Sequence, residues 1–337
     1  MFYLINFILT FLLIIIFSKL AKNFKLVDYP NARKLHKGPV PLVGGISIFI
    51  SILILIPFIN LNYSFLIIIL SSSIILFLGA LDDAIELGVI VRLISQLIAS
   101  LVVIGTGLSI IDIGDYYYFY PIQLGIFGIL LTVFSVIGLT NAINFIDGID
   151  GLCSGLILVA LLSLFFYINL SGIDNELIEI KILIVSIFAF FLVNIGFSPF
   201  NKVFLGDAGS MALGFILSWL LIYYSHPSYR SIHPVLTIWC VALPIFDLLG
   251  VVIRRVLRGI NPFKSDRRHI HHILLDLNIS TQKVFLLLII ISIILSLIGG
   301  IVFFNFGPLP ALLSYFISFS IYLYFSLFLS RKVFSNM

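Results

Sequence analysis

The sequence alternates between long apolar stretches and short polar loops along its whole length. A helix needs about 20 apolar residues to cross the hydrocarbon core of a bilayer, and eleven stretches approach that length. They cover residues 2–20, 42–60, 64–81, 91–110, 124–143, 152–171, 178–197, 208–225, 234–253, 284–304 and 309–330. The pattern therefore predicts an all-α polytopic membrane protein with about eleven transmembrane helices.

Composition supports this interpretation. Of the 337 residues, 61% are hydrophobic and 10% are charged, with a mean hydropathy of +1.23. These values lie far outside the usual range of soluble domains, and no polar stretch is long enough to fold separately. We predict one integral membrane domain over residues 1–337. The first stretch lacks the basic start and the cleavage site of a signal peptide, so we expect it to remain as a helix.

The basic residues predict an orientation. With the N-terminus outside and eleven crossings, 17 of the 19 Lys and Arg residues lie in cytoplasmic segments, which carry a net charge of +7 against −3 outside. This asymmetry follows the positive-inside rule and places the C-terminus in the cytoplasm. The pI near 9.0 thus reflects orientation in the cytoplasmic (inner) membrane and does not indicate nucleic-acid binding.

Polar residues gather on the predicted cytoplasmic side. Each cytoplasmic loop between two predicted helices carries a small polar cluster, whereas the outside loops are short. The five clusters lie in residues 28–45, 82–96, 141–151, 201–210 and 254–283. They predict one shared site at the cytoplasmic membrane surface. Cys153 and Cys240 lie in or beside apolar stretches, so we expect them to pack as apolar residues and not to form a disulfide.

The segment Asn141–Leu152 places two amides and two carboxylates at intervals of three residues between apolar stretches. A carboxylate costs about 2.5–3.5 kcal/mol at the centre of a membrane helix, so acids in such a segment indicate a function. Gly148 and Gly151 loosen the backbone there. We interpret the segment as a broken helix that lines a polar cavity; the alternative is a tight interfacial turn with its acids facing water.

Two further acidic positions stand at predicted helix ends. The carboxylates of Asp82 and Asp83 repel each other unless a cation lies nearby. This favours a role for the pair as metal ligand or general base. The alternative is a solvated helix end with Arg92 as counter-ion. Asp207 follows Gly206 at a helix start, where it could hold a divalent cation beside a phosphate that binds the free N–H groups. An Asp that simply caps the helix is the common alternative.

Histidines and arginines cluster in the last cytoplasmic loop. His269, His271 and His272 are half of the six histidines and directly follow Arg267 and Arg268. No Cys and no further ligand pattern supports zinc, so the cluster is better suited to a phosphate or diphosphate. The alternative is a basic loop that attracts anionic lipid.

Three single residues complete the candidates. Lys37 in the first loop could contact phosphate or uracil-type oxygens. Phe204 either stacks on a base or packs like the other phenylalanines. Asp247, inside an apolar stretch, either forms a buried ion pair or lines the site.

Together these parts predict phosphoryl transfer to a lipid. Carboxylates suit Mg²⁺, with Mn²⁺ as an alternative, and Mg²⁺ in turn binds substrate phosphates. Such transfers depend mainly on positioning and on neutralising charge at the transferred phosphorus. A site at the membrane surface lets a water-soluble nucleotide donor meet a membrane-bound acceptor.

The ordered set of motifs resembles the polyprenyl-phosphate N-acetylhexosamine-1-phosphate transferases, which form glycosyltransferase family 4. The matching segments are Arg33–Gly45, Asp82–Gln96, Asn141–Leu152, Gly206–Ser210 and Arg267–His272. They occur in family order between about residues 28 and 275. Any one of them is weakly specific, but five in order are specific.

The resemblance implies a Mg²⁺-dependent transfer of a sugar-1-phosphate from a UDP-sugar to undecaprenyl phosphate, with release of UMP. It implies that Asp82 deprotonates or orients the lipid phosphate with Asp83 close by, and that Asp207 is the principal Mg²⁺ ligand. The remaining implied site residues are Asn144, Asp147, Asp150 and Phe204 around the nucleotide, and His269, His271 and His272 at the diphosphate or sugar. Lys37, Arg267 and Arg268 stay candidates for substrate binding on their charge alone.

The sequence also favours one branch of that family. Members of the peptidoglycan branch, which transfers phospho-MurNAc-pentapeptide, have three consecutive His residues in the last cytoplasmic loop and the sequence Thr-Pro-Thr-Met-Gly-Gly in the first loop. This chain has His-Ile-His-His at 269–272 and Pro-Leu-Val-Gly-Gly at 41–45. It is more similar to the branch that uses UDP-GlcNAc or a related N-acetylhexosamine to begin O-antigen, teichoic acid or another envelope glycan. The peptidoglycan reaction is the alternative.

Two other functional classes fit the pattern less well. A secondary transporter would show repeat symmetry and polar residues near the membrane midplane. A membrane scaffold would not need acids and histidines to converge. The expected partners are therefore a UDP-N-acetylhexosamine, undecaprenyl phosphate and membrane lipid, without nucleic acid; formation of a homodimer is left open.

Overall fold

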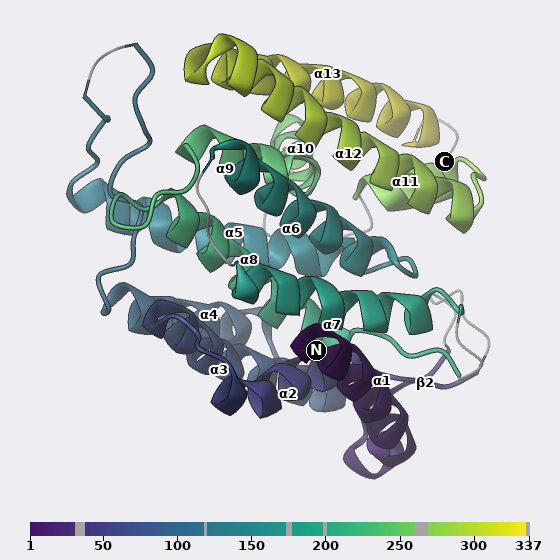
Figure 1. Ribbon diagram of the computed structural model, residues 1–337. Helices are drawn as coiled ribbons and strands as arrows, with labels where there is room; N and C mark the ends of the chain where they lie inside the picture. The colour runs from purple at the N-terminus through teal and green to yellow at the C-terminus, as the bar shows by residue number, and fades with distance from the viewer. Residues whose placement is uncertain (31–37, 118–119, 173–176, 198–200, 260–268, 335–337) are drawn as a thin grey trace.

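A computed structural model describes the chain except for residues 31–37, 118–119, 173–176, 198–200, 260–268 and 335–337. Its described part is helical apart from loops and one two-stranded sheet (Figure 1). The helices are α1 (Phe2–Leu20), α2 (Gly44–Leu55), α3 (Tyr63–Ile85), α4 (Val89–Ile104), α5 (Ile126–Ile146), α6 (Leu152–Leu170), α7 (Ile178–Asn194), α8 (Gly206–Ser225), α9 (Pro234–Cys240), α10 (Ala242–Leu257), α11 (Ile270–Asp276), α12 (Thr281–Phe306) and α13 (Pro308–Phe334). Short 3₁₀ helices, η1 (Ala21–Phe24) and η2 (Ile56–Phe58), follow α1 and α2.

Each of the eleven predicted apolar stretches coincides with helix in the structure. Among the described residues, seven helices are long and apolar enough to cross a membrane. An eighth span is formed if α9 and α10 count as one broken helix, bent by 77° at Val241. The prediction of an all-α polytopic membrane protein is thus confirmed. The shorter helices α2 and α4 are apolar but do not reach spanning length alone, so the number of crossings stays a prediction.

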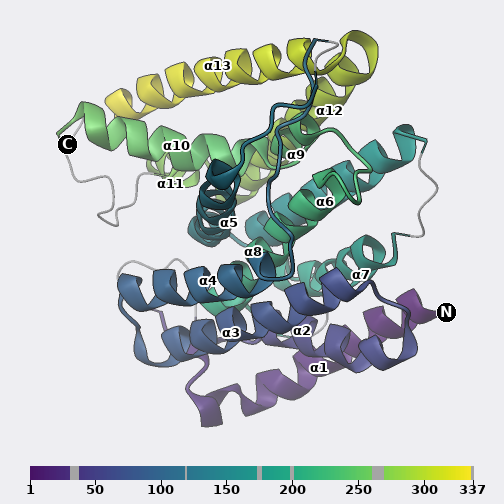
Figure 2. The same cartoon turned by 90° about the vertical axis from the view of Figure 1, so that its left-hand side faces the viewer.

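Helix α8 lies at the centre of the bundle. It packs against α3, α5, α2 and α6, and nearly all of its residues are buried. Figures 1 and 2 show α1 to α4 on one side of it and α12 and α13 on the other. Because α8 starts at Gly206, its first turn carries Asp207 at one end of this central helix.

Small residues let α8 approach its neighbours. A Cβ added to Gly45 of α2 would lie 2.0 Å from the Cα of Gly209, and one added to Gly79 of α3 would lie 2.5 Å from the Cα of Ala208. These contacts are between backbones, so side chains larger than hydrogen would push the helices apart. The close approach places the end of α3 directly beside the start of α8.

The first loop is held against the same place. Strands β1 (Val27–Asp28) and β2 (Val40–Pro41) pair antiparallel, and the chain then runs alongside the segment before α8. Phe204 donates its backbone N–H to the carbonyl of Pro41 at 2.9 Å, and its own carbonyl accepts from Gly44 at 3.0 Å. The start of α8 is therefore framed by α2, α3 and the first loop.

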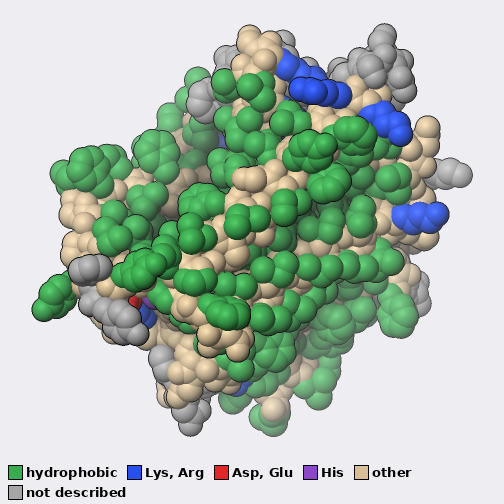
Figure 3. Space-filling model, turned by 90° about the horizontal axis from the view of Figure 1, so that it is seen from above, with side chains coloured by type: hydrophobic (Ala, Val, Ile, Leu, Met, Phe, Trp, Pro, Cys, Tyr) green, Lys and Arg blue, Asp and Glu red, His purple; other side chains and the backbone are tan. Residues whose placement is uncertain are grey.

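The outer surface is suited to lipid. Many large apolar side chains on α1, α4, α12 and α13 are exposed. Figure 3 shows the face over α12 and α13 covered by hydrophobic side chains, with Lys and Arg gathered toward one edge. An exposed apolar surface of this extent is expected of a protein whose solvent is the bilayer.

One prediction about the backbone is wrong. The segment 141–152 is not a broken span: α5 ends at Ile146, a tight turn occupies residues 147–151, and α6 begins at Leu152. The carboxylates of Asp147 and Asp150 are exposed on that turn, which was the alternative interpretation. Gly151 takes a φ of +74°, a conformation that favours glycine, and this allows the sharp reversal. Cys153 and Cys240 are buried and free, as predicted.

Candidate active site at one end of the helix bundle

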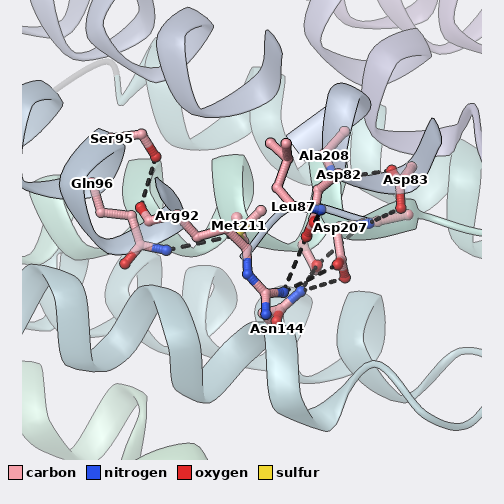
Figure 4. A network of polar contacts seen from close by, with 12 residues as sticks. Asp82, Asp83, Leu87, Arg92, Ser95, Gln96, Asn144, Asp207, Ala208 and Met211 are labelled. Carbon is pink, nitrogen blue, oxygen red and sulfur yellow. Dashed lines mark hydrogen bonds and ion pairs between the residues drawn. The ribbon is translucent and has the colours of Figure 1, made fainter. Parts of the chain in front are cut away.

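Carboxylates from two helices meet around one arginine (Figure 4). A single nitrogen of Arg92, Nη1, lies 3.1 Å from Asp82 Oδ2 and 3.4 Å from Asp207 Oδ2. Asp82 is buried, whereas the Asp207 side chain is 39% exposed and reaches open space. Helices α3, α4 and α8 thus bring a buried acid and an accessible acid to one point, which we call the site end of the bundle.

Asp83 binds the start of α8. Its two carboxylate oxygens accept the backbone N–H groups of Asp207 at 2.9 Å and Ala208 at 3.2 Å. The first N–H groups of a helix have no partner inside the helix, and a carboxylate there is favoured by the helix dipole. Gly206 is needed at this junction because its φ is +77° and an added Cβ would lie 2.7 Å from Asp83 Oδ2. Asp83, and not Asp207, therefore caps α8, which leaves the side chain of Asp207 available.

Amides at the end of α5 complete the network. Asn144 Nδ2 donates to Asp207 Oδ1 at 2.8 Å and to Ser210 Oγ at 2.9 Å. One turn earlier, Asn141 Nδ2 donates to Gln96 Oε1 at 2.7 Å. This ladder fixes the last turns of α5 against α4 and α8. Asn144 is thereby placed next to the accessible acid.

The turn after α5 faces the same cluster. Surrounding protein atoms raise the pKa of Asp147 to about 8, and the negative charges of Asp207, Asp83 and Asp150 act in the same direction. Its side chain is nonetheless open to water on one side. The described residues of this cluster thus include more carboxyl groups than basic groups, and the raised pKa shows that ionising all of them together is unfavourable.

A lysine joins the turn to the segment before α8. Lys202 Nζ forms an ion pair with Asp150 Oδ2 and lies 5.8 Å from the centre of the Phe204 ring. Asn194, at the end of α7, holds both segments because it accepts from the Gly151 N–H at 2.6 Å and donates to the Val203 carbonyl at 2.9 Å. Asp150 and Phe204 therefore both lie near Lys202.

The histidines pack beside the end of α5. The rings of His269 and Phe145 lie 5.2 Å apart, and a Cβ added to Gly148 would lie 2.6 Å from His271 Nε2. His271 is buried, whereas His272 is half-buried with its ring 4.0 Å from that of His271. The three histidines thus border the turn that carries Asp147 and Asp150. Lys37, Arg267 and Arg268 lie outside the described residues.

Some contributors escaped prediction from the sequence. Lys202 and Asn194 received no role, although a lysine two residues before Phe204 and an Asn at the end of an apolar stretch were visible signals. Asp247 received two alternative roles, and the structure bonds it to His269 at 2.8 Å. Its further partner, Tyr322 on α13, is one tyrosine among 14 and gave no signal.

The donor set limits how a metal could bind. Within the described ranges, no group of three or more His, Cys, Asp or Glu side chains could by itself hold a metal ion. Mg²⁺ does not need such a cage, because it is usually bound by one or two carboxylates together with substrate phosphates and water. Asp207, with Asp82 beside it, provides carboxylates of this kind in a place where negative charge is in excess.

Comparison with known proteins shows which family the sequence resembles. A sequence model described as glycosyl transferase family 4 matches residues 65–225, which include Asp82, Asn144 and Asp207. The chain is 33% identical to an undecaprenyl-phosphate alpha-N-acetylglucosaminyl 1-phosphate transferase of Yersinia pestis, over 84% of this chain and 78% of that protein.

Two further relatives have the same name. The protein of Escherichia coli strain K12 is 33% identical, over 87% of this chain and 81% of its own length. The protein of Haemophilus influenzae is 34% identical, over 95% of this chain and 92% of its own length. The similarity thus extends over nearly the whole chain and includes every described cluster of the site end.

Proposed function

This chain belongs to glycosyl transferase family 4, and we propose that it transfers N-acetylglucosamine-1-phosphate from UDP-N-acetylglucosamine to undecaprenyl phosphate. A phosphate oxygen of the lipid attacks the phosphorus attached to the sugar. The new phosphoanhydride bond forms as the bond between the two phosphates of the donor breaks. UMP leaves, and the product is an undecaprenyl diphosphate-linked sugar that begins an envelope glycan.

The observation that carries this proposal is the accessible Asp207 at the start of α8, which accepts a hydrogen bond from Asn144 and shares Arg92 with Asp82. These residues fit Mg²⁺, with Mn²⁺ as an alternative, because hard oxygen ligands and excess negative charge are what such ions require. Asp207 would be the principal protein ligand. The ion, when bound, supplies neutralisation of charge on the donor diphosphate.

We assign the neighbouring acids to the lipid phosphate. Asp82 is held by Arg92 and by the Leu87 N–H, so its carboxylate has a fixed direction. It would orient the acceptor phosphate or remove its proton. Asp83 would act indirectly, because both of its oxygens are engaged by the first N–H groups of α8.

The opposite wall of the site suits the nucleotide and the sugar. Asp147, Asp150 and Phe204 would border the uridine, with Lys202 poised near the ring of Phe204. His269, His271 and His272 would face the diphosphate or the sugar. Lys37, Arg267 and Arg268, which lie outside the described residues, would add positive charge at phosphate oxygens.

We further propose that the chain crosses the cytoplasmic membrane eleven times, with its N-terminus outside and the site end in the cytoplasm. The supporting observation is the distribution of charge, since 17 of 19 Lys and Arg residues then lie inside. A cytoplasmic site also places the carboxylates where a water-soluble UDP-sugar reaches them.

The transfer can be measured directly with the purified full chain in detergent or in vesicles. UMP should appear only when UDP-N-acetylglucosamine, undecaprenyl phosphate and Mg²⁺ are all present. A panel of UDP-N-acetylhexosamines identifies the preferred sugar. Absence of UMP with every member of the panel would contradict the proposed function.

A further inference from the structure

A fully buried acid, Asp247, lies outside the carboxylate cluster, within α10. Its Oδ2 lies 2.8 Å from Nδ1 of His269, and its Oδ1 accepts the Ile270 N–H at 2.9 Å and the Tyr322 hydroxyl at 3.0 Å. One carboxylate thus binds the first residues of α11 and a side chain of α13.

These contacts select one form of the His269 ring. A carboxylate accepts hydrogen bonds, so the proton of the neutral imidazole resides on Nδ1. Nε2 then presents a lone pair on the opposite side of the ring. His269 is largely buried, and the structure gives its Nε2 no hydrogen bond to a described residue.

The ring of His269 borders the site already described. Its ring lies 5.2 Å from that of Phe145, the residue after Asn144. His271, two residues further on, packs against Gly148 in the turn that carries Asp147. The position of α11 therefore sets how the histidines meet the nucleotide side of the site.

A contribution to folding stability does not by itself explain why a buried acid stands at position 247. Taking a carboxylate out of water is costly, and well-packed apolar residues often replace buried ionic groups without loss of stability. A carboxylate that orients a functional histidine, in contrast, fixes both the tautomer and the direction of the ring.

We propose that Asp247 is a positioning residue, which holds His269 with Nε2 turned toward the diphosphate or sugar of the donor and fixes α11 against α10. Tyr322 supports Asp247 from α13. The inference rests on the proposed transferase function for its kinetic consequence, but the tautomer of His269 can be tested without any turnover.

Kinetics test the positioning role through Asp247→Asn. The amide keeps the size of the side chain but can offer an N–H to Nδ1, which favours the other tautomer. We expect kcat to fall by about 10–100-fold, as for other partners that orient a functional histidine. The double variant Asp247→Asn, His269→Ala should be no slower than His269→Ala alone. Additive losses would overturn the proposal, because Asp247 would then not act through His269.

A matched control separates positioning from general damage. Asp112→Asn removes the charge of another buried acid, one paired with Arg230 at the opposite end of the bundle. It should leave kcat unchanged. Should Asp247→Asn fail to fold, Tyr322→Phe removes one hydroxyl only, and the loss of that hydrogen bond should lower kcat by about 2–10-fold. An unchanged kcat in Tyr322→Phe would then contradict the proposal.

Nitrogen NMR of histidine-labelled protein gives the independent measurement. In the wild-type chain the resonance that disappears in His269→Ala should report a protonated Nδ1, and in Asp247→Asn it should report a protonated Nε2. If this change of tautomer is seen in a protein that shows no transfer activity, the inference about His269 holds and the proposed function is rejected. A protonated Nε2 in the wild type would reject the inference and leave the proposed function intact.

Discussion

The two ends of the bundle each contain a buried aspartate beside an arginine, but they differ in charge balance. At the far end, Asp112 receives both of its ion-pair contacts from one nitrogen of Arg230, at 2.6 and 2.8 Å. At the site end, one nitrogen of Arg92 is shared by Asp82 and Asp207 at the longer distances of 3.1 and 3.4 Å. Around Arg230 one carboxylate meets one guanidinium, whereas around Arg92 two carboxylates share one guanidinium.

This difference separates a structural pair from a functional one. A buried carboxylate is tolerated when one well-placed guanidinium compensates it, which describes Asp112. Carboxylates that share one guanidinium leave uncompensated negative charge, which a divalent cation and its phosphate ligands can balance. The far end is therefore expected to contribute stability, and the site end is expected to contribute chemistry.

The largest expected effect comes from Asp207→Asn. This change preserves the shape of the side chain but removes the proposed principal ligand of Mg²⁺. Transfer should fall about 10³-fold or more, because the charge stabilisation by a metal is worth several kcal/mol. Steady-state UMP release measures the loss. Near wild-type turnover in a folded Asp207→Asn protein would break the comparison between the ends.

Arg92→Gln sharpens the comparison. Without the guanidinium, Asp82 and Asp207 repel each other and the protein without metal should lose about 1.5–3 kcal/mol of stability. Added Mg²⁺ should then raise the unfolding temperature by more than it does in the wild type. Thermal unfolding with and without Mg²⁺ measures both effects. If Mg²⁺ raises the unfolding temperature of Arg92→Gln no more than that of the wild type, Asp82 and Asp207 do not bind the ion.

Asp112→Asn tests the far end. The amide cannot pair with Arg230 as a carboxylate does, so the free energy of unfolding should fall by about 1–3 kcal/mol. The transfer rate per folded molecule should stay at the wild-type value. A loss of turnover with unchanged stability would reverse the roles that we assign to the two ends.

The smallest effect is expected from Lys202→Ala. Its ion pair with Asp150 is partly exposed, so it contributes little to stability. Loss of its charge at the nucleotide side should raise KM for the UDP-sugar by about 2–10-fold. An exposed charge interaction or a cation–π contact contributes about 0.5–1 kcal/mol or slightly more, which corresponds to a change of this size. Lys181→Ala is the matched control, because Lys181 lies 5.9 Å from the Phe165 ring at the far end. Equal changes in KM for both variants would contradict a specific role for Lys202.

Sequence reasoning located the elements of the fold better than their connections. The apolar stretches were long enough to predict every main helix, because burial in lipid leaves an unmistakable composition. The turn at 147–151 could not be predicted, because two glycines are compatible both with a broken helix and with a tight reversal. Only the end of α5 at Ile146 distinguishes the two.

The sequence indicates which acids belong to the candidate site, but it does not indicate the separate role of each acid. Asp82, Asp83 and Asp207 stood out because charge is rare in this chain. That Asp83 caps α8 depends on the close packing of α3 against α8 through Gly79 and Ala208, which is a contact between distant segments. Such pairings have no local signature in a single sequence, and the same holds for Asp247 and Tyr322.

The central claim is that the excess of carboxylates at the site end serves Mg²⁺-dependent sugar-phosphate transfer. The most direct test follows labelled N-acetylglucosamine from its UDP derivative into undecaprenyl-linked lipid, in parallel for the wild type, Asp207→Asn and Asp112→Asn. We predict Mg²⁺-dependent transfer by the wild type and Asp112→Asn, none when the ion is chelated, and almost none by Asp207→Asn. Transfer by folded Asp207→Asn at close to the wild-type rate would contradict the account, and so would loss of transfer in folded Asp112→Asn.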